Sequence, residues 1–245
     1  MALPLLLGFM LLPPPKPVDS LDIPDRYRGR IVLVQPKQFS EKVVALTFDD
    51  GPDPKVTAQI LKTLKKNDAK ATFFILGQNA HYYPETVKLI AAQGHAIGQH
   101  SWSHAAKADA KKAEVEFTKT NSLLKNLIGY RPVMYRPPYG ITKNGMTALA
   151  LKENDAVILW TRIANDTMTK SPAKVNLNVG TPGPGEIVLM HDGYGKTWTA
   201  EALPRIIKRL KNKGYKFVTV PEMLRKWDQY LNVHPDRGAT KPWHL

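Results

Sequence analysis

The chain has 245 residues, with 35 Lys and Arg against 21 Asp and Glu, a formal net charge of +14 and no cysteine. The lack of cysteine excludes disulfides, thiolate nucleophiles, cysteine zinc fingers and iron–sulfur clusters, so any metal ion must bind to His, Asp or Glu. The length suits one or two domains, and the charge favours an anionic partner such as nucleic acid, a lipid surface or an acidic polymer.

Residues 1–30 combine an apolar segment with a proline-rich linker. The apolar run at 5–12 stops at Pro13 and is too short to span a bilayer, but it has the length of a signal-peptide core. No basic residue precedes it and no clear cleavage site follows. We expect a secreted or membrane-tethered protein, with a cytoplasmic protein as the alternative. A folded domain is predicted at 31–233 and a loose tail at 234–245.

From residue 42 onward, short β-type runs alternate with segments of helical periodicity. In chain order we predict a strand at 42–48, a helix at 56–64, a strand at 71–76, a helix at 86–93, a strand at 96–98, a helix at 117–128, a strand at 133–135, a helix at 143–152, strands at 157–160 and 186–190, a helix from 203 to near 214, a strand at 217–220 and a helix at 222–231.

This alternation indicates parallel βαβ units. The fold class is therefore α/β, a single distorted or incomplete (β/α) barrel with seven to eight parallel strands. A doubly wound open sheet is the competing layout. No glycine-rich phosphate loop follows the first strand, which argues against the nucleotide-binding version of that sheet.

Polar residues follow the predicted strands at their carboxyl ends, where parallel α/β folds carry their sites. We therefore expect these residues to meet at one end of the barrel. They are Asp49 and Asp50 after the first strand, His100 and His104 after the third, Arg136 to Tyr139 after the fourth, Trp160 and Asp166 after the fifth, and His191 and Asp192 after the sixth.

Three of these residues form a candidate metal site. His100 and His104, at i and i+4, are predicted to lie on one side of a helical turn, from which both can reach one ion. Asp50 completes a His-His-carboxylate set that suits zinc or another divalent ion and leaves positions open. Asp49 is expected to point elsewhere from extended backbone and to act as a base. The alternative for a single Asp at this place is a helix cap.

His191 follows a hydrophobic strand and is a natural proton donor to a leaving amine near neutral pH. A packing or capping role is the alternative for it. The basic run from 205 to 213 is expected to be a solvated helix face.

Four segments together resemble motifs of the polysaccharide deacetylases of carbohydrate esterase family four, the NodB-homology domain. They are Thr-Phe-Asp-Asp-Gly-Pro at 47–52, His-Ser-Trp-Ser-His at 100–104, Arg-Pro-Pro-Tyr at 136–139 and Leu-Met-His-Asp at 189–192. The resemblance covers roughly residues 43–224. It implies a distorted (β/α) barrel that hydrolyses acetyl groups on a sugar polymer. With such a substrate, Tyr82, Tyr83 and Trp198 are left open between stacking on a sugar ring and local packing.

The resemblance also implies a role for each matching residue. Asp50, His100 and His104 would hold one divalent metal ion, usually zinc, with Asp49 as general base and His191 as general acid. Arg136 would orient Asp49, and Asp166 would support His191. The Tyr139 backbone N–H would stabilise the oxyanion, and Leu189, Pro138 and Trp160 would line the substrate site. The fourth motif departs from the family, because Thr167 stands where Trp is common, and this changes the wall of the pocket.

We therefore expect metal-dependent hydrolysis of N-acetyl groups on peptidoglycan or chitin-like N-acetylglucosamine, with release of acetate. A non-catalytic glycan-binding barrel and a hydrolase of a non-sugar amide are the alternatives. The positive charge suits contact with an anionic cell wall or membrane surface in a bacterial envelope. No nucleic-acid partner is expected, because no basic-aromatic recognition motif is present.

Overall fold

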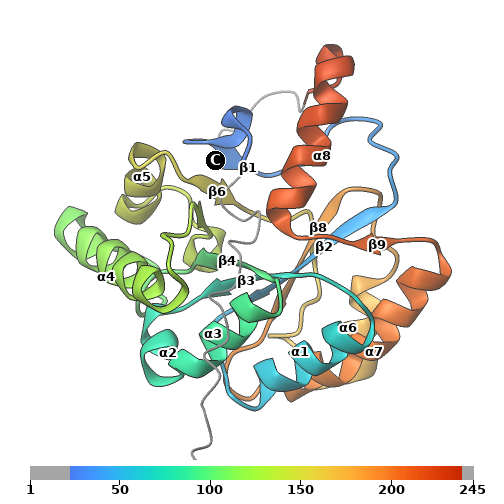
Figure 1. Ribbon diagram of the computed structural model, residues 1–245, viewed down its shortest axis with the longest axis horizontal. Coiled ribbons are helices and arrows are strands. Elements are labelled where there is room, and N and C mark those ends of the chain that lie inside the picture. The colour runs from blue at the N-terminus through green and yellow to red at the C-terminus, as the bar shows by residue number, and fades with distance from the viewer. Residues whose placement is uncertain (1–22, 239–245) are drawn as a thin grey trace, which may run out of the picture.

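The computed structural model describes residues 23–238 (Figure 1). One sheet contains every strand of this part, and all its pairings are parallel. The strands are β1 (Ile31–Val32), β2 (Val43–Asp49), β3 (Thr72–Ile75), β4 (Ala96–Gln99), β5 (Met134–Tyr135), β6 (Ala156–Ile158), β7 (Arg162–Ile163), β8 (Glu186–His191) and β9 (Lys216–Phe217).

Helices cover the outside of the sheet and one of its ends (Figure 1). They are α1 (Val56–Lys66), α2 (Gly77–Tyr82), α3 (Pro84–Ala92), α4 (Ala110–Ile128), α5 (Gly145–Lys152), α6 (Pro172–Val179), α7 (Thr197–Asn212) and α8 (Val220–Val233), with 3₁₀ turns at Asp25–Tyr27, Pro138–Gly140 and Pro235–Arg237. Within residues 23–238, no helix combines the length and apolar character needed to cross a membrane.

The strand order is β1-β6-β5-β4-β3-β2-β8-β7, with β9 beside the start of β2. Among the described residues, β1 and β7 are not paired with each other, so the barrel is incomplete, and the predicted fold class is confirmed. The elements β1, β7, α2 and α6 are not among those predicted. Two-residue strands and very short helices carry too little periodicity to stand out in a sequence.

Strand β2 is central and buried along its whole length, which explains its nearly continuous apolar sequence. Its side chains alternate between two cores. Leu46 and Phe48 join the cluster under α1 and α7, whereas Val43 and Ala45 join the barrel interior, which Trp227 of α8 also fills. Helix α8 thus packs against the end of the barrel where the strands begin.

The register of β2 and β8 brings two predicted site residues together. Asp49 and His191, the last residues of these strands, are direct partners in the ladder. The opposite end of the barrel, closed by α8, carries no member of the predicted site. The carboxyl ends of the strands therefore form the candidate active face, as the sequence predicts.

The packed region is wider than the predicted 31–233. Ile23 is buried, Arg26 pairs with Asp228 on α8 at 2.7 Å, and the Lys37 N–H donates to the Arg237 carbonyl at 3.0 Å. Residues 23–30 are therefore part of the fold and not of a linker, and 234–237 are not loose. The apolar segment at 5–12 and the tail from 239 onward lie outside the described residues.

Candidate active site

The carboxylate of Asp49 is held by a buried arginine. Arg136 has no exposed surface, and its Nη1 donates to Asp49 Oδ1 at 2.8 Å and to Thr47 Oγ1 at 2.7 Å. The other guanidinium nitrogens donate to the carbonyls of Ile158 at 3.0 Å and Leu159 at 3.1 Å. Each of the three guanidinium nitrogens is thus engaged, which fixes the cation and the orientation of the Asp49 carboxylate paired with it.

Asp50, His100 and His104 converge beside Asp49. One ligand atom from each lies within 4.8 Å of the others. Asp50 Oδ1 is 3.5 Å from His100 Nε2 and 3.3 Å from His104 Nε2. His100 Nδ1 donates to the Arg136 carbonyl at 2.7 Å, which leaves the lone pair of Nε2 facing Asp50.

The electrostatics of this cluster suit a cation. Burial alone would raise the pKa of Asp50, but the neighbouring imidazoles, first His100 and then His104 and His191, hold that pKa well below its ordinary value. Burial and then the charge of His100 lower the pKa of His104, which favours the neutral, ligating imidazole. Asp50 Oδ1 is buried without a hydrogen-bond partner. A divalent ion would satisfy this oxygen, so the three residues fit such an ion.

The loop that carries the two histidines differs from the prediction. Residues 100–109 contain no helix. Ser101 and His104 have left-handed backbone, at φ 68° and 60°, and the Ser101 hydroxyl accepts from the His104 N–H at 3.1 Å. Glu116 of α4 accepts from the Trp102 N–H at 2.9 Å. The expectation of a helical turn is therefore wrong, because side chains replace the helical hydrogen bonds that would position His104.

The backbone at Asp50 also differs from the prediction. Asp50 has φ 72°, so the two carboxylates diverge because the second residue is left-handed and not because the backbone is extended. Asn79 of α2 donates to the Asp50 carbonyl at 2.7 Å. Gly193 packs against Asp50, and a Cβ there would lie 2.9 Å from the Asp50 Cβ. These contacts hold the strained residue in place.

His191 is fixed by a buried carboxylate. Its Nδ1 donates to Asp166 Oδ1 at 2.8 Å, and its backbone N–H donates to Asp166 Oδ2 at 2.7 Å. Thr199 also donates to Oδ2, at 2.7 Å. Burial would lower the pKa of His191, but the hydrogen bond and charge of Asp166, with Asp49 and Asp50, raise it above its ordinary value. The imidazolium form, which can donate a proton, is therefore favoured.

The remaining predicted residues surround this group. Tyr139 is 66% exposed, has left-handed backbone at φ 57°, and its ring centroid lies 4.5 Å from that of His104. Pro138 and Leu189 are buried, and Trp160 is half-buried. A Cβ on Gly140 would come within 2.9 Å of the Trp160 ring. All four come from the strand ends that carry the charged residues, and the structure places them at the same face.

Thr167, which stands where the family commonly has Trp, is exposed. The aromatic residue beside Asp166 is Trp198 of α7, whose Nε1 donates to the Asp166 carbonyl at 2.6 Å. Of the two alternatives for Trp198, the structure shows the local contact. Only the fold brings Trp198 to Asp166, so no sequence signal links them.

Asp192 is a buried carboxylate whose part in the site the sequence analysis missed. Its Oδ2 accepts from Thr57 Oγ1 at 2.6 Å, and a Cβ on Gly51 would lie 2.2 Å from the same oxygen. Burial, aided by the charges of Asp50 and Asp49, raises the pKa of Asp192 to about 7. Asp192 follows His191 in the sequence, but only the fold shows that its carboxylate packs against Gly51, the residue after Asp50.

Comparison with known proteins gives a consistent set of relatives. The polysaccharide deacetylase family model matches residues 36–156. A peptidoglycan-N-acetylglucosamine deacetylase of Bacillus cereus is 40% identical over 192 residues, which are 76% of this chain and 70% of that protein. The peptidoglycan-N-acetylmuramic acid deacetylase PdaC of Bacillus subtilis is 37% identical over 187 residues, 75% of this chain and 39% of that protein. A crystal structure of a peptidoglycan N-acetylglucosamine deacetylase has a TM-score of 0.74 at 38% identity and covers 79% of this chain and 92% of that one.

Proposed function

This chain belongs to the polysaccharide deacetylase family of hydrolases, as its motifs predict, and we propose that it removes N-acetyl groups from peptidoglycan with the help of one divalent metal ion. The observation that carries this proposal is the pairing of Asp49 and His191 across β2 and β8, directly beside Asp50, His100 and His104. The names of the relatives favour peptidoglycan over a chitin-like polymer.

Asp50, His100 and His104 would hold the ion, and their nitrogen and carboxylate donors suit zinc. When bound, such an ion acts as a Lewis acid that polarises the amide carbonyl and makes water more acidic. The protein supplies the rest of the chemistry. Asp49 takes a proton from the attacking water, and Arg136 holds that carboxylate in a fixed orientation.

Collapse of the tetrahedral adduct requires a proton on the departing amine. His191 supplies it, since Asp166 stabilises the imidazolium and fixes the ring through Nδ1, which leaves Nε2 to donate. The Tyr139 backbone N–H is the donor proposed for the developing oxyanion. Leu189, Pro138 and Trp160 would enclose the acetyl group and its sugar.

The test is acetate release from peptidoglycan and from N-acetylglucosamine oligomers, with zinc or cobalt supplied. Asp49→Asn and His191→Ala should each lower kcat by about 10² or more, which is typical for loss of a general base or acid. Asp68→Asn, an exposed carboxylate outside the site, serves as the matched control. Unchanged activity in both active-site variants would contradict the assigned roles. Glycan binding by the wild type without any product would support the non-catalytic barrel instead.

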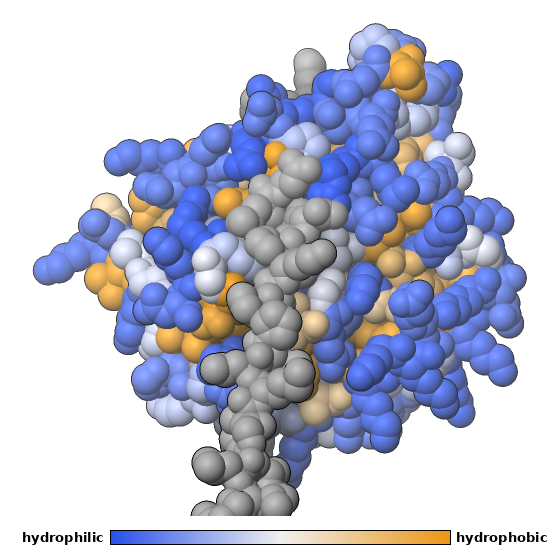
Figure 2. All heavy atoms as spheres, viewed as in Figure 1, coloured by the Kyte–Doolittle hydropathy of each residue, from blue (hydrophilic) through white to orange (hydrophobic). Residues whose placement is uncertain are grey.

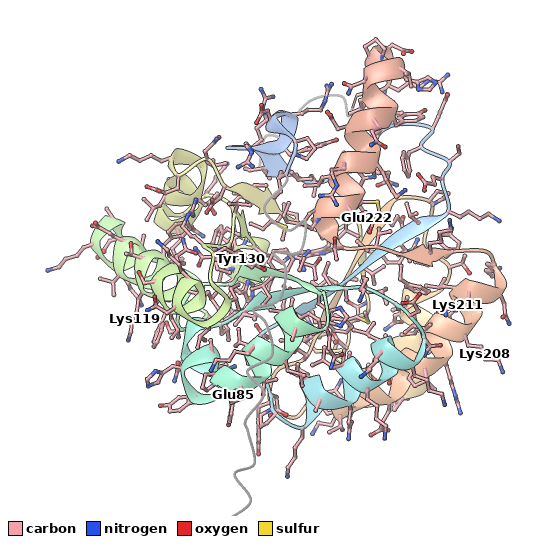
Figure 3. All side chains as sticks on the ribbon, viewed as in Figure 1. Glu85, Lys119, Tyr130, Lys208, Lys211 and Glu222 are labelled. Atoms are coloured by element: carbon pink, nitrogen blue, oxygen red, sulfur yellow. The ribbon has the colours of Figure 1, made fainter. Side chains whose placement is uncertain are left out.

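We also propose that the protein works at the bacterial envelope, secreted or tethered, where its positive charge contacts an anionic wall or membrane surface. A basic groove of about 430 Å³ between α1 and α7, which are neighbours in Figure 1, supports this contact. The surface over these helices is mostly hydrophilic (Figure 2), and Lys208 and Lys211 are labelled in Figure 3. The lysines of the groove are Lys62, Lys66, Lys208 and Lys211. They stand toward the carboxyl ends of helices that run antiparallel to the strands, so the groove lies away from the catalytic face.

Retention on isolated cell walls tests this contact, because an electrostatic contact at the surface weakens as salt screens it. Replacing the four groove lysines by Gln should lower retention at low salt. The control for net charge replaces four exposed lysines on or just before α4 by Gln: Lys107, Lys111, Lys112 and Lys125. Retention that ignores salt would instead point to the apolar segment at 5–12 as the anchor. Cell fractionation of the full chain tests the location.

A further inference from the structure

A second pocket lies next to the candidate active site and takes no part in the chemistry described above. It has a volume of about 370 Å³ and lies where α2 and α4 meet the loop after β4. We call it the α2–α4 pocket. Its lining residues are Gln78, His81, Tyr82, Trp102, Ser103 and Lys119.

The same segments of the chain form the pocket and hold the candidate metal-binding residues in place. Trp102 and Ser103 stand between His100 and His104 in the chain. The N–H groups of Gly77 and Gln78, at the start of α2, donate to the carbonyls of Ser101 and Trp102 at 2.9 and 3.0 Å. The next residue of α2, Asn79, donates to the Asp50 carbonyl. A ligand in the pocket is therefore held at a fixed position relative to the metal-binding residues.

The walls of the pocket present aromatic rings to solvent. Tyr82 is 64% exposed, and the centroid of the His81 ring lies 5.6 Å from that of Tyr82 and 6.1 Å from that of Trp102. Contiguous exposed rings of this kind are uncommon on a surface that binds nothing. Flat rings with a polar edge are suited to the apolar face and the hydroxyl rim of a sugar.

A positively charged side chain, that of Lys119, also lines the pocket. Lys119 lies on α4 (Figure 3), and its Nζ is 3.6 Å from the centroid of the Trp102 ring. The nearby carboxylate of Glu116 is already occupied by the N–H groups of Trp102 and Ser103 and by the Ser103 hydroxyl. Within the part of the chain that the structure describes, no carboxylate forms an ion pair with Lys119. Its charge is therefore available to an anionic ligand.

We propose that the α2–α4 pocket is a subsite for a carboxylate-bearing sugar unit of the glycan strand whose neighbouring unit is deacetylated. The ring of that unit would lie against His81 and Tyr82, and its carboxylate would pair with Lys119. This inference rests on the proposed function, because it assumes that the glycan strand reaches the candidate metal-binding residues. It adds to that function a preference of the protein for glycan strands with regularly spaced negative charges over neutral strands.

The test compares two soluble substrates: peptide-free glycan strands from peptidoglycan, whose muramic acid units carry a carboxylate, and neutral N-acetylglucosamine hexamer. Lys119→Met should raise KM for the carboxylated strand about tenfold and change KM for the hexamer less than about twofold, while kcat stays within about twofold. Lys119→Arg should restore the preference. Lys111→Met, on the same helix outside the pocket, is the control.

Tyr82→Ala tests the aromatic wall of the α2–α4 pocket separately and should raise KM for both substrates about fivefold. Trp102 is left intact, because its ring packs where a Cβ on Gly77 would lie and its loss would disturb the metal loop. Equal KM ratios for the wild type and Lys119→Met, in variants with unchanged thermal unfolding, would overturn the proposal.

A direct binding measurement separates this inference from the proposed function. If no acetate is released from either substrate, calorimetric titration of the carboxylated strand still compares the wild type with Lys119→Met. Weaker binding by the variant would support the subsite even though the proposed function had failed. No binding by the wild type, or equal binding by both, would overturn the subsite.

Discussion

Replacing Asp166 by Asn should shift the pH dependence of the reaction and not merely slow it. In the wild type, Asp166 raises the pKa of His191 against the effect of burial. His191 then stays protonated, and able to donate, to higher pH. The neutral amide introduced by Asp166→Asn removes that charge, so the pKa of His191 falls and the alkaline limb of the pH–rate profile moves to lower pH.

The magnitude follows from the contact that is lost. Nδ1 of His191 donates to Oδ1 of the fully buried Asp166 at 2.8 Å. A hydrogen bond to a charged group contributes about 1.5–3 kcal/mol, and one pKa unit corresponds to about 1.4 kcal/mol. The expected shift is therefore about 1–2 pH units. The amide oxygen of the introduced side chain can still accept from either the His191 backbone or Thr199, which preserves part of the local structure.

The assay is acetate release across pH 5–10, fitted for the alkaline limb of kcat/KM. His191→Ala should abolish that limb, which assigns it to this residue. An Asp166→Asn variant with reduced kcat but an alkaline limb at the wild-type pH would refute the reasoning. The role of Asp166 would then be orientation of the ring alone, with no contribution to its charge.

Three other changes test separate parts of the structure. Arg131→Met leaves Asp155 buried without the guanidinium that donates to both its oxygens at 2.8 Å, and should lower the free energy of unfolding by about 2 kcal/mol at pH 7. Burial already raises the pKa of Asp155 to about 6, above its unfolded value, so any loss should shrink as pH falls toward 4; a pH-independent loss in urea unfolding would contradict this. Gly77→Ala would place a methyl group 2.5 Å from the Trp102 ring, and zinc titration should show weaker binding although the metal-binding residues are intact. His104→Ala removes one of these residues and should weaken zinc binding by more than about a hundredfold, and zinc should no longer raise the thermal midpoint.

The strand ends of the site could be predicted because burial and order both appear in the sequence. The central strand is buried on both faces, so its apolar run is nearly unbroken until Asp49. The same rule located His191 at the end of β8. Parallel topology then placed these ends at one edge of the sheet. The direct pairing of Asp49 with His191 depends on the strand order, which was not predicted from the sequence.

Backbone conformation and long-range contacts could not be predicted in the same way. The i, i+4 spacing of His100 and His104 suggested a helix, but the left-handed residues of this loop are stabilised by Glu116, which is distant in the sequence. Helix α2 is too short to show periodicity, although its Asn79 supports Asp50. Such features depend on which segments the fold brings together, and the periodicity of apolar residues in the sequence does not indicate these long-range contacts.

The register between β2 and β8 has a consequence for how this protein can change over evolutionary time. The spacing of Asp49 and His191 is set by a hydrogen-bonded ladder in the centre of the sheet, and no loop length enters into it. Insertions between His104 and α4, or a remodelled segment between Asp166 and α6, would alter which polymer fits while leaving Asp49, His191 and the residues that hold them in place. Residues that contact the polymer and residues that set the spacing of Asp49 and His191 therefore lie in different parts of the chain. The range of substrates can change through these loops while the reaction stays the same.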